Sequence, residues 1–176
     1  MIRFDLRAIL QCTVSSVYGD LVTRRTGQAV RTGVEERLTE PTGDVAVIDF
    51  TAVRCMDFSC ADEIVGKLLL QHGRGRYFML VGLDEGHMQA IQPVLERHGL
   101  AVVGQDRAGS LRLLGTIPDP ARRAFGVVAT AGTAAPSEVA ARMTVTEDVA
   151  QAALDDLLDR RLIQQGDGGY QPIRCA

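Results

Sequence analysis

Two hydrophobic patterns follow each other in the first half of the chain. Val45 to Phe50 form an apolar run broken only by Asp49, which is typical of a strand covered on both faces. Beyond it, apolar residues recur at the i, i+3, i+4, i+7, i+8 spacing of one helix face. These residues are Ala61, Ile64, Val65, Leu68 and Leu69. The stretch 45–70 therefore predicts a buried strand, a short connection and a helix packed on the same sheet.

Similar elements are predicted on the N-terminal side of this stretch. The first 14 residues alternate loosely between apolar and polar, which indicates an edge strand. An amphipathic helix follows, supported by an Arg31–Glu35 pair and ended by Pro41 and Gly43. Its apolar stripe consists of Ala29, Val30, Val34 and Leu38.

Strands and helices keep alternating after this stretch. Segments 77–83, 100–104 and 110–115 are strand candidates. Segment 85–100 has helical spacing, although Pro93 in its interior should kink the helix or delay its start. The alternation predicts an α/β fold with a parallel or mixed sheet and packed helices. The expected core residues are Val47, Ile48, Ile64, Leu68, Phe78, Leu80 and Val102.

The last third of the chain has a different pattern. Pro118 and Pro120 follow a loose segment, which places a domain boundary between residues 117 and 118. Residues 118–176 predict three short helices and two extended pieces around a glycine-rich turn, the order of a winged helix-turn-helix. We therefore expect an α/β domain at 1–117 and a winged-helix domain at 118–176. The expected buried stripe of the third helix is Val149, Ala153, Leu154, Leu157 and Leu158.

Composition limits the class of protein. The 176 residues are 46% hydrophobic with a net charge of −3, which allows well-formed cores but gives no overall basic character. No apolar stretch approaches the ~20 residues that cross a membrane, and no secretion signal opens the chain, so we expect a cytoplasmic protein without membrane contact. The four cysteines lack metal-ligand spacing and are expected to be reduced and mostly buried. We expect neither a metal nor a cofactor.

Catalytic constellations are not indicated by the sequence. The three histidines fall at predicted helix ends without a nearby Ser–Asp arrangement, so capping or solvent-exposed roles are expected rather than a catalytic triad. Arg24, Arg25 and Arg31 cluster around the start of the first predicted helix and could meet a nucleotide or phosphate, but a solvated face explains them more simply. We therefore expect a non-enzymatic protein.

The start of the helix predicted after the buried strand carries Asp57 and Ser59. Both side chains suit helix capping, and Asp62 lies three residues after Ser59, as in a capping box. Spacing alone therefore favours a capping role for this turn.

The segment VIDFTAVRCMDFSCADEIVGKLL resembles the STAS domain of anti-sigma-factor antagonists, in which a strand ending in an aspartate leads to a D-x-S sequence at a helix N-terminus. Within it, SCADEIVGKL is similar to a STAS-like family whose function is mostly unassigned. The resemblance covers residues 18–104 and implies phosphorylation of the motif serine, here Ser59, by a partner anti-sigma kinase. Two residues depart from the STAS motif, since Cys60 stands where a small residue is usual and Phe58 replaces a second serine.

These observations lead to two hypotheses of function. In the first, the chain is a regulatory protein of partner-switching signalling that binds an anti-sigma-type ATPase or kinase, or another regulatory protein, and is gated at Ser59. In the second, the winged helix binds DNA as a transcriptional regulator and the STAS-like domain senses a signal or dimerises. The partner-contact residues expected under the first hypothesis are Asp57, Phe58, Cys60, Asp62 and Glu63.

Charge disfavours the DNA hypothesis. Residues 119–176 contain six Arg, no Lys and eight acidic residues, a net charge of −2, whereas phosphate neutralisation dominates affinity for DNA. The third helix, which would enter the major groove, turns a mostly acidic face outward, and the tip of the expected wing carries no cation. Four arginines that could align on another face keep the hypothesis open, namely Arg122, Arg123, Arg160 and Arg161.

Overall fold

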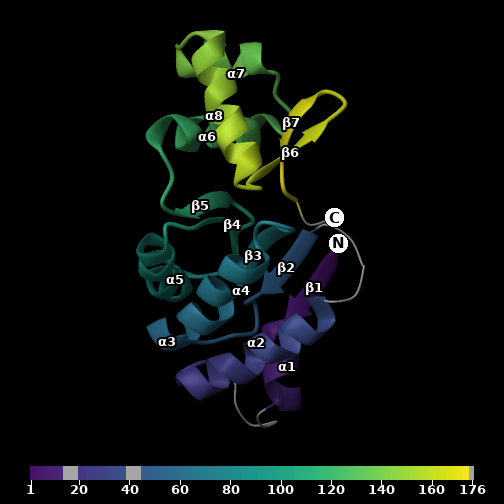
Figure 1. Cartoon of the computed structure of the whole chain (residues 1–176), viewed down its shortest axis with the longest axis vertical. Helices are drawn as coiled ribbons and strands as arrows, with labels where there is room; N and C mark the ends of the chain where they lie inside the picture. The colour runs from purple at the N-terminus through teal and green to yellow at the C-terminus, as the bar shows by residue number, and fades with distance from the viewer. Residues whose placement is uncertain (14–19, 39–44, 175–176) are drawn as a thin grey trace. The chain divides into compact units, whose positions relative to one another are not determined.

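The computed structural model describes residues 1–13, 20–38 and 45–174. The chain divides into two compact units, Met1–Thr116 and Ile117–Ala176 (Figure 1). This division falls one residue before the boundary placed from the sequence. Among the helices of the described residues, none has both the length and the apolar character needed to cross a membrane.

The first unit is built, within the described residues, on one five-stranded sheet with the order β1-β2-β3-β4-β5. Strands β1 to β4 are parallel, and β5 pairs antiparallel with β4. The predicted α/β fold with a parallel or mixed sheet is therefore confirmed. The strands are β1 (Ile2–Asp5), β2 (Val45–Asp49), β3 (Tyr77–Leu83), β4 (Ala101–Asp106) and β5 (Leu111–Gly115).

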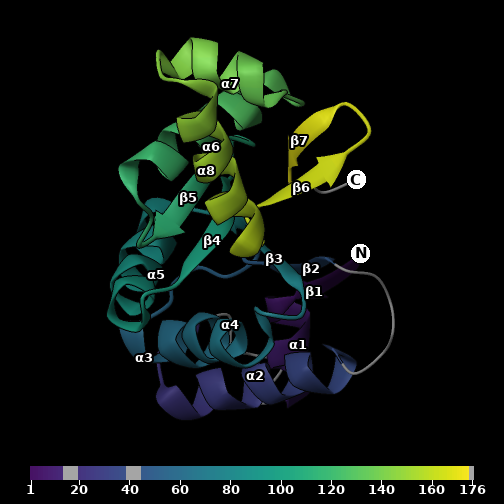
Figure 2. The ribbon, with the colours of Figure 1, turned by 45° about the horizontal axis from the view of Figure 1, so that its top comes forward.

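The connections between the parallel strands carry helices that lie on one face of the sheet (Figure 2). Neighbouring strands follow one another in sequence order, so right-handed crossovers bring every connection to the same face. These helical elements are α1 (Leu6–Thr13), α2 (Arg24–Leu38), α3 (Phe58–Ala61), the π-helical turn η1 (Asp62–Gly66), α4 (Lys67–His72) and α5 (Glu85–His98).

The core of the first unit lies between these helices and the sheet. Side chains alternate along a strand, so every second strand residue points into this core. Val47 is buried as expected, but it points to the opposite face of the sheet and lies outside the helix-side cluster. The other six predicted core residues belong to that cluster, namely Ile48, Ile64, Leu68, Phe78, Leu80 and Val102.

Some elements differ locally from those predicted. The edge strand β1 stops at Asp5, and helix α1, which was not predicted, follows at once because it buries an apolar face against the sheet. Helix α5 begins at Glu85, as the spacing of 85–100 predicts, and of the two expected effects of Pro93 the delayed start does not occur. Helix α1 was missed because local signals around a short edge strand are weak.

Helix α2 follows its prediction closely. Three of the four predicted stripe residues are buried, whereas Ala29 is half-buried. The predicted pair forms, with Arg31 Nη1 2.9 Å from Glu35 Oε1. The expected stop at Pro41 and Gly43 lies outside the described residues.

The helix after β2 changes geometry along its length, because η1 separates α3 from α4. A π-helical turn closes i→i+5 hydrogen bonds and is wider than an α-helical turn. All five residues of η1 are buried, and the predicted apolar stripe from Ala61 to Leu69 is buried with them. The wide turn therefore brings the carboxylates of Asp62 and Glu63 into the interior together with the apolar stripe.

The second unit contains, within the described residues, three helices and a two-stranded antiparallel hairpin, the predicted order of elements. Ala134, between the first two helices, pairs with Tyr170 of the hairpin through two backbone hydrogen bonds of 3.0 and 2.9 Å. The elements are α6 (Asp119–Ala131), α7 (Pro136–Met143), α8 (Glu147–Asp159), β6 (Ile163–Gly166) and β7 (Gly169–Pro172).

The buried face of α8 differs from the predicted one at its start. The prediction was wrong for Val149, which is 44% exposed, and Leu158 is only half-buried. Both the predicted and the observed sets have helical spacing, so apolar character alone did not separate Val149 from its neighbour Ala150. The buried residues are Ala150, Ala153, Leu154 and Leu157.

His87 forms the start of α5 in the interior of the first unit. It is fully buried, and its ring lies 5.5 Å from that of Phe50. The His87 N–H donates to Asp84 Oδ1 at 3.0 Å, and the Asp84 N–H donates to His87 Nδ1 at 3.3 Å. Burial lowers the pKa of the His87 imidazole below its ordinary value, with Asp84 opposing this shift and Arg107 adding to it. The folded chain therefore holds this histidine neutral.

We expect the first unit to lose stability as the pH falls below about 6.5, the ordinary pKa of histidine, because the unfolded chain binds a proton on His87 that the folded chain resists. His87→Gln keeps a side chain able to complete the cap but cannot be protonated. The difference in free energy of unfolding between wild type and this variant, measured by urea titration at several pH values, should change by up to about 1.4 kcal/mol per pH unit below this pH. If the unfolding free energies of the two proteins changed in parallel with pH, this would contradict the assignment of His87 as a buried neutral residue.

Candidate functional site

The N-terminal turn of α3 is organised around the carboxylate of Asp57. Asp57 occupies the N-cap position, and its Oδ1 accepts the Cys60 N–H at 2.8 Å. The Ser59 hydroxyl donates to the same carboxylate, with Oγ 2.9 Å from Oδ1 and 3.0 Å from Oδ2. The expectation that Ser59 and Asp62 form a capping box is wrong, because Asp57 supplies the cap and Asp62 turns inward.

The Asp57 carboxylate stays ionised at neutral pH. Burial acts to raise its pKa, but the hydrogen bonds from the Cys60 N–H and from Ser59 outweigh it, so the pKa lies below its ordinary value. A negative charge therefore sits beside the Ser59 hydroxyl and holds its proton. The remaining lone pairs of Oγ point away from Asp57, and the Ser59 side chain is half-exposed.

A short extended segment before α2 holds this turn in place. The Leu21 N–H donates to the Cys55 carbonyl at 3.0 Å, and the Asp57 N–H donates to the Leu21 carbonyl at 2.9 Å. The thiol of Cys60 donates to the Thr23 carbonyl at 2.9 Å. Burial raises the pKa of Cys60 to about 12, so this thiol is a structural donor and not a nucleophile.

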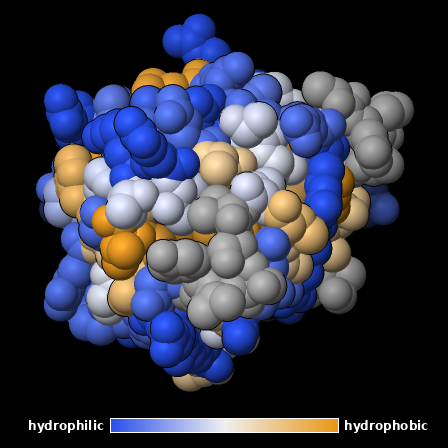
Figure 3. Space-filling view, turned by 90° about the horizontal axis from the view of Figure 1, so that it is seen from below, coloured by the Kyte–Doolittle hydropathy of each residue, from blue (hydrophilic) through white to orange (hydrophobic). Residues whose placement is uncertain are grey.

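Two exposed apolar side chains belong to this region, one in the α3 turn itself and one in the segment that pairs with the residues before it. Phe58, directly before Ser59, is 40% exposed, and Val22, next to the Leu21–Met56 bridge, is 50% exposed. Large exposed hydrophobic residues are few in the described part of the chain. The view from below shows a mostly hydrophilic surface with small separate hydrophobic areas (Figure 3). Phe58 is therefore a large exposed apolar side chain directly before the half-exposed Ser59, and Val22 lies in the segment that pairs with this part of the chain.

Behind this turn, the carboxylate of Glu63 is buried among three cations. Its side chain is 1% exposed, and it pairs with Arg24 Nη1 at 2.8 Å, with Arg31 Nε at 3.3 Å and with the Lys67 ammonium. Burial acts to raise the pKa of Glu63, but hydrogen bonds from Lys67 and then Arg24 lower it below its ordinary value. Glu63 therefore joins α2 to the helix after β2 as a permanent anion.

Asp62, the residue before Glu63 in η1, is also held by side chains from two other helices. Its Oδ2 lies 3.0 Å from Arg24 Nη1, and its Oδ1 lies 3.0 Å from His98 Nε2 at the end of α5. Against the effect of burial, these hydrogen bonds from His98 and Arg24 lower the pKa of the Asp62 carboxyl. One guanidinium, that of Arg24, thus bridges both buried carboxylates.

The structure divides the predicted contact residues into two groups. Asp57 and Phe58 lie at the surface beside Ser59. Cys60, Asp62 and Glu63 are buried, and the bonds just described engage their side chains inside the unit, so these three side chains are not exposed to a partner in this structure. Cys60 lies in α3 and donates to the Thr23 carbonyl, whereas Asp62 and Glu63 face inward because η1 buries consecutive positions, which α-helical spacing does not predict.

The sequence pointed to Arg24 and Arg31, and to Glu35 as a partner of Arg31, but not to their shared partner Glu63. The arginine cluster was ascribed to a solvated face, whereas both guanidinium groups bind the Glu63 carboxylate across 39 and 32 residues of sequence. Lys67 is the one partner with a local signal, since it lies four residues after Glu63. His98 has no such signal. The cysteine prediction was wrong in part, because Cys12 and Cys55 are exposed free thiols.

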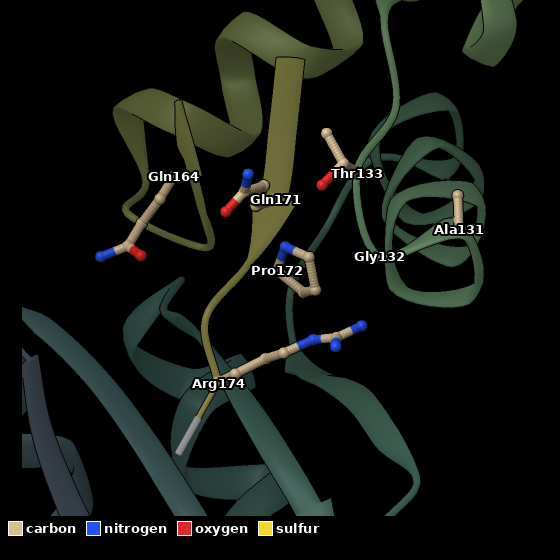
Figure 4. Close-up of a pocket in the computed structure, with 7 residues that line it drawn as sticks. All are labelled: Ala131, Gly132, Thr133, Gln164, Gln171, Pro172 and Arg174. Carbon is tan, nitrogen blue, oxygen red and sulfur yellow. The ribbon is translucent and has the colours of Figure 1, made fainter. Parts of the chain in front are cut away.

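The second unit carries a polar hollow of about 390 Å³ (Figure 4). It lies between the end of α6, the connection to α7 and the hairpin. The described residues that line it offer two amides, a hydroxyl and a guanidinium but no carboxylate, so no acid–base pair is assembled there. The lining residues are Ala131, Gly132, Thr133, Gln164, Gln171, Pro172 and Arg174.

The outward face of α8 is acidic around an apolar centre. Val149 and Ala152 are exposed on it, and the exposed carboxylates are those of Glu147, Asp148, Asp155 and Asp159.

Comparison of the chain with protein-family models, with curated proteins and with solved structures finds no match. The function is therefore inferred from the geometry of these sites.

Proposed function

We propose that this chain is a non-enzymatic regulatory protein that acts through protein–protein contacts, with a STAS-like first unit gated by phosphorylation of Ser59. The observation that carries the proposal is the Asp57–Ser59 pair, a half-exposed serine hydroxyl hydrogen-bonded to an ionised carboxylate and flanked by the exposed Phe58. The partner is an ATPase or kinase of the anti-sigma type. Phe58 and Val22 supply the apolar contact area.

Phosphorylation requires only the hydroxyl oxygen to be accessible. The partner kinase holds a nucleoside triphosphate, and Ser59 Oγ forms a bond to its γ-phosphorus while the bond to the nucleoside diphosphate breaks. The hydroxyl proton passes to a carboxylate base of the kinase. Asp57 is a weak base because its pKa is lowered, so its role is to orient the hydroxyl with the lone pairs of Oγ turned outward.

The consequence of phosphorylation is electrostatic. The phosphate adds about −1.5 to −2 charges beside the Asp57 carboxylate, on a surface that otherwise offers a neutral hydroxyl and an aromatic ring. A kinase shaped for the neutral surface would then face like charges and a hydrated group at the centre of the contact. The phosphorylated chain is therefore released, as partner switching requires.

The sheet topology also favours binding over catalysis. In open parallel sheets, substrates bind in the crevice where the strand order reverses. Here β1 to β4 follow one another in a single direction, so this part of the sheet has no such reversal. Active-site chemistry at the carboxyl edge would lack the usual crevice, which supports a protein that presents a surface rather than a cleft.

For the second unit we propose a winged-helix module that contacts protein. Three helices followed by a hairpin, with a bridge between Ala134 and Tyr170, support the winged-helix assignment. The acidic outward face of α8 supports protein contact over DNA, since phosphates would meet Glu147, Asp148 and Asp155 at the position of a recognition helix.

Ser59→Asp is expected to weaken the binding of the partner kinase by at least about tenfold, because it places a charge at the centre of the contact. Ser59→Ala should bind like wild type, since it keeps the surface neutral. The partner can be captured from the native host with the full chain and identified by mass spectrometry, which also reports phosphorylation of Ser59. Titration calorimetry with the purified partner then measures affinity.

Ser110→Asp is a matched control for this comparison. Ser110 is an exposed serine of the same unit, between β4 and β5, so its substitution adds the same charge away from the α3 turn. It should leave binding unchanged. Equal affinities of Ser59→Asp and Ser59→Ala for the partner would contradict the proposed switch. If Ser110→Asp weakened binding as much as Ser59→Asp, the effect would come from the net charge of the chain and not from position 59.

A further inference from the structure

We infer that Arg24 receives the phosphate of phosphorylated Ser59, and that it does so by leaving the buried carboxylates it bridges in the unmodified chain. This inference rests on the proposed phosphorylation of Ser59 and names the group on the chain that responds to it. Its basis is the arrangement of three cations and one histidine around Asp62 and Glu63.

The phosphate cannot stay where the hydroxyl lies. Ser59 Oγ is 2.9 Å from Asp57 Oδ1, and that oxygen also accepts the Cys60 N–H. A phosphoryl group on Oγ has no proton to donate to Asp57 and carries charge of the same sign. The Ser59 side chain must therefore turn away from Asp57, while Asp57 keeps its bond to Cys60 as the cap of α3.

Turning along the helix brings the phosphate toward Arg24. Residues three and four positions after Ser59 are its neighbours on the helix surface, and these are Asp62 and Glu63. Arg24 Nη1 binds both of them, at 3.0 and 2.8 Å. The Arg24 side chain is 51% exposed, and a guanidinium offers five N–H donors that suit a phosphate. Arg24 is therefore a half-exposed cation of α2, and it is bound to the two residues that lie one turn after Ser59 in the other helix.

The buried carboxylates can release Arg24 without being left unpaired. Glu63 keeps Arg31 at 3.3 Å and the Lys67 ammonium, and Asp62 keeps His98 at 3.0 Å. A buried charge left without any partner would be strongly destabilising. Glu63 keeps two cations and Asp62 keeps a hydrogen-bond partner, so Arg24 can leave both carboxylates without leaving either one unpaired.

Transfer of Arg24 gives the phosphorylated state a defined form. Arg24 is the first residue of α2, so its bond to the phosphate ties the start of α2 to the α3 turn. An aspartate at position 59 is shorter and carries one charge, so it should reproduce this bond poorly. The phosphorylated chain is thus expected to differ from Ser59→Asp in structure as well as in charge.

The test uses the full chain with phosphoserine installed at position 59 during translation, and no partner. A phosphorus NMR titration measures the second pKa of the phosphate, which is about 6 for an unpaired phosphoserine. A nearby guanidinium favours the dianion, so Arg24→Gln should raise this pKa by about one unit. Arg25→Gln, the removal of an exposed arginine from the adjacent position of α2, should raise it by only about a tenth of that amount.

Equal pKa values in wild type and Arg24→Gln, or equal shifts in Arg24→Gln and Arg25→Gln, would overturn the inference. If Arg24→Gln does not fold, the wild-type chain still decides, because the Arg24 side-chain NMR signals should shift on phosphorylation and those of Arg25 should not. Unshifted Arg24 signals would refute the transfer. Since the phosphate is installed without a kinase, these outcomes are independent of whether a partner phosphorylates Ser59 or responds to it.

Discussion

Ile48→Asp is expected to yield a chain whose first unit does not fold. Ile48 is 1% exposed in β2, within the cluster that joins the sheet to its helices. A carboxylate there would be buried without a partner, so the chain must either hold it protonated or open the sheet. Expression of the full chain should give insoluble protein, or soluble protein without the cooperative unfolding transition of the first unit in urea.

Ile48→Val is the matched control, because it removes one methylene group and adds no charge. It should cost about 1 kcal/mol of unfolding free energy and leave a cooperative transition. A soluble, cooperatively unfolding Ile48→Asp protein would show that the side chain at position 48 does not lie in the core between the sheet and its helices.

Gly82→Ala is expected to destabilise the first unit by several kcal/mol. Gly82 has φ +70°, a region that residues with a Cβ adopt at a cost. A Cβ at this position would lie 2.6 Å from the backbone nitrogen of Thr51, and Thr51 Oγ1 would be closer still. The methyl group must therefore push β3 away from the turn that leaves β2, and this turn leads toward Asp57 and Ser59.

Gly99→Ala separates the two contributions. Gly99 ends α5 with φ +62°, nearly the same backbone conformation, but a Cβ there would meet nothing within 4 Å. Its cost should be only the conformational one, about 1 kcal/mol. Urea unfolding of both variants gives the comparison, and a Gly82→Ala protein as stable as Gly99→Ala would contradict the close approach of β3 to Thr51.

Much of the first unit follows from hydrophobic periodicity. Ile48, Ile64 and Leu80 were assigned to a core because their spacing matches a strand, a helix and a second strand, and burial depends directly on that spacing. The short helix α1 was missed because the eight residues after Asp5 carry too few turns to stand out from an irregular edge segment. Val149 was misplaced because a small alanine, rather than a larger valine, fills the buried position of α8.

The candidate site was less accessible to sequence inspection. Asp57 and Ser59 are neighbours in sequence, so their roles in one helix turn could be anticipated. The pairing of Arg24 with Glu63 could not, because it depends on the packing of α2 against η1 and joins residues 39 positions apart. The π-helical geometry that buries Asp62 beside Glu63 has no recognisable pattern of its own, since the apolar stripe through it keeps ordinary helical spacing.

The π-helical turn also bears on how sequences of this kind should be aligned. Such a turn holds one residue more than an α-helical turn, so a chain lacking one residue between Asp62 and Gly66 could keep a continuous α-helix and the same sheet. In that chain, the segments before and after the missing residue would keep their faces, because the π-helical turn absorbs the extra residue. The residue that aligns with Ser59 across a gap within 62–66 would therefore face outward as Ser59 does. An alignment that puts the gap before Ser59 would equate the serine with a residue on another face.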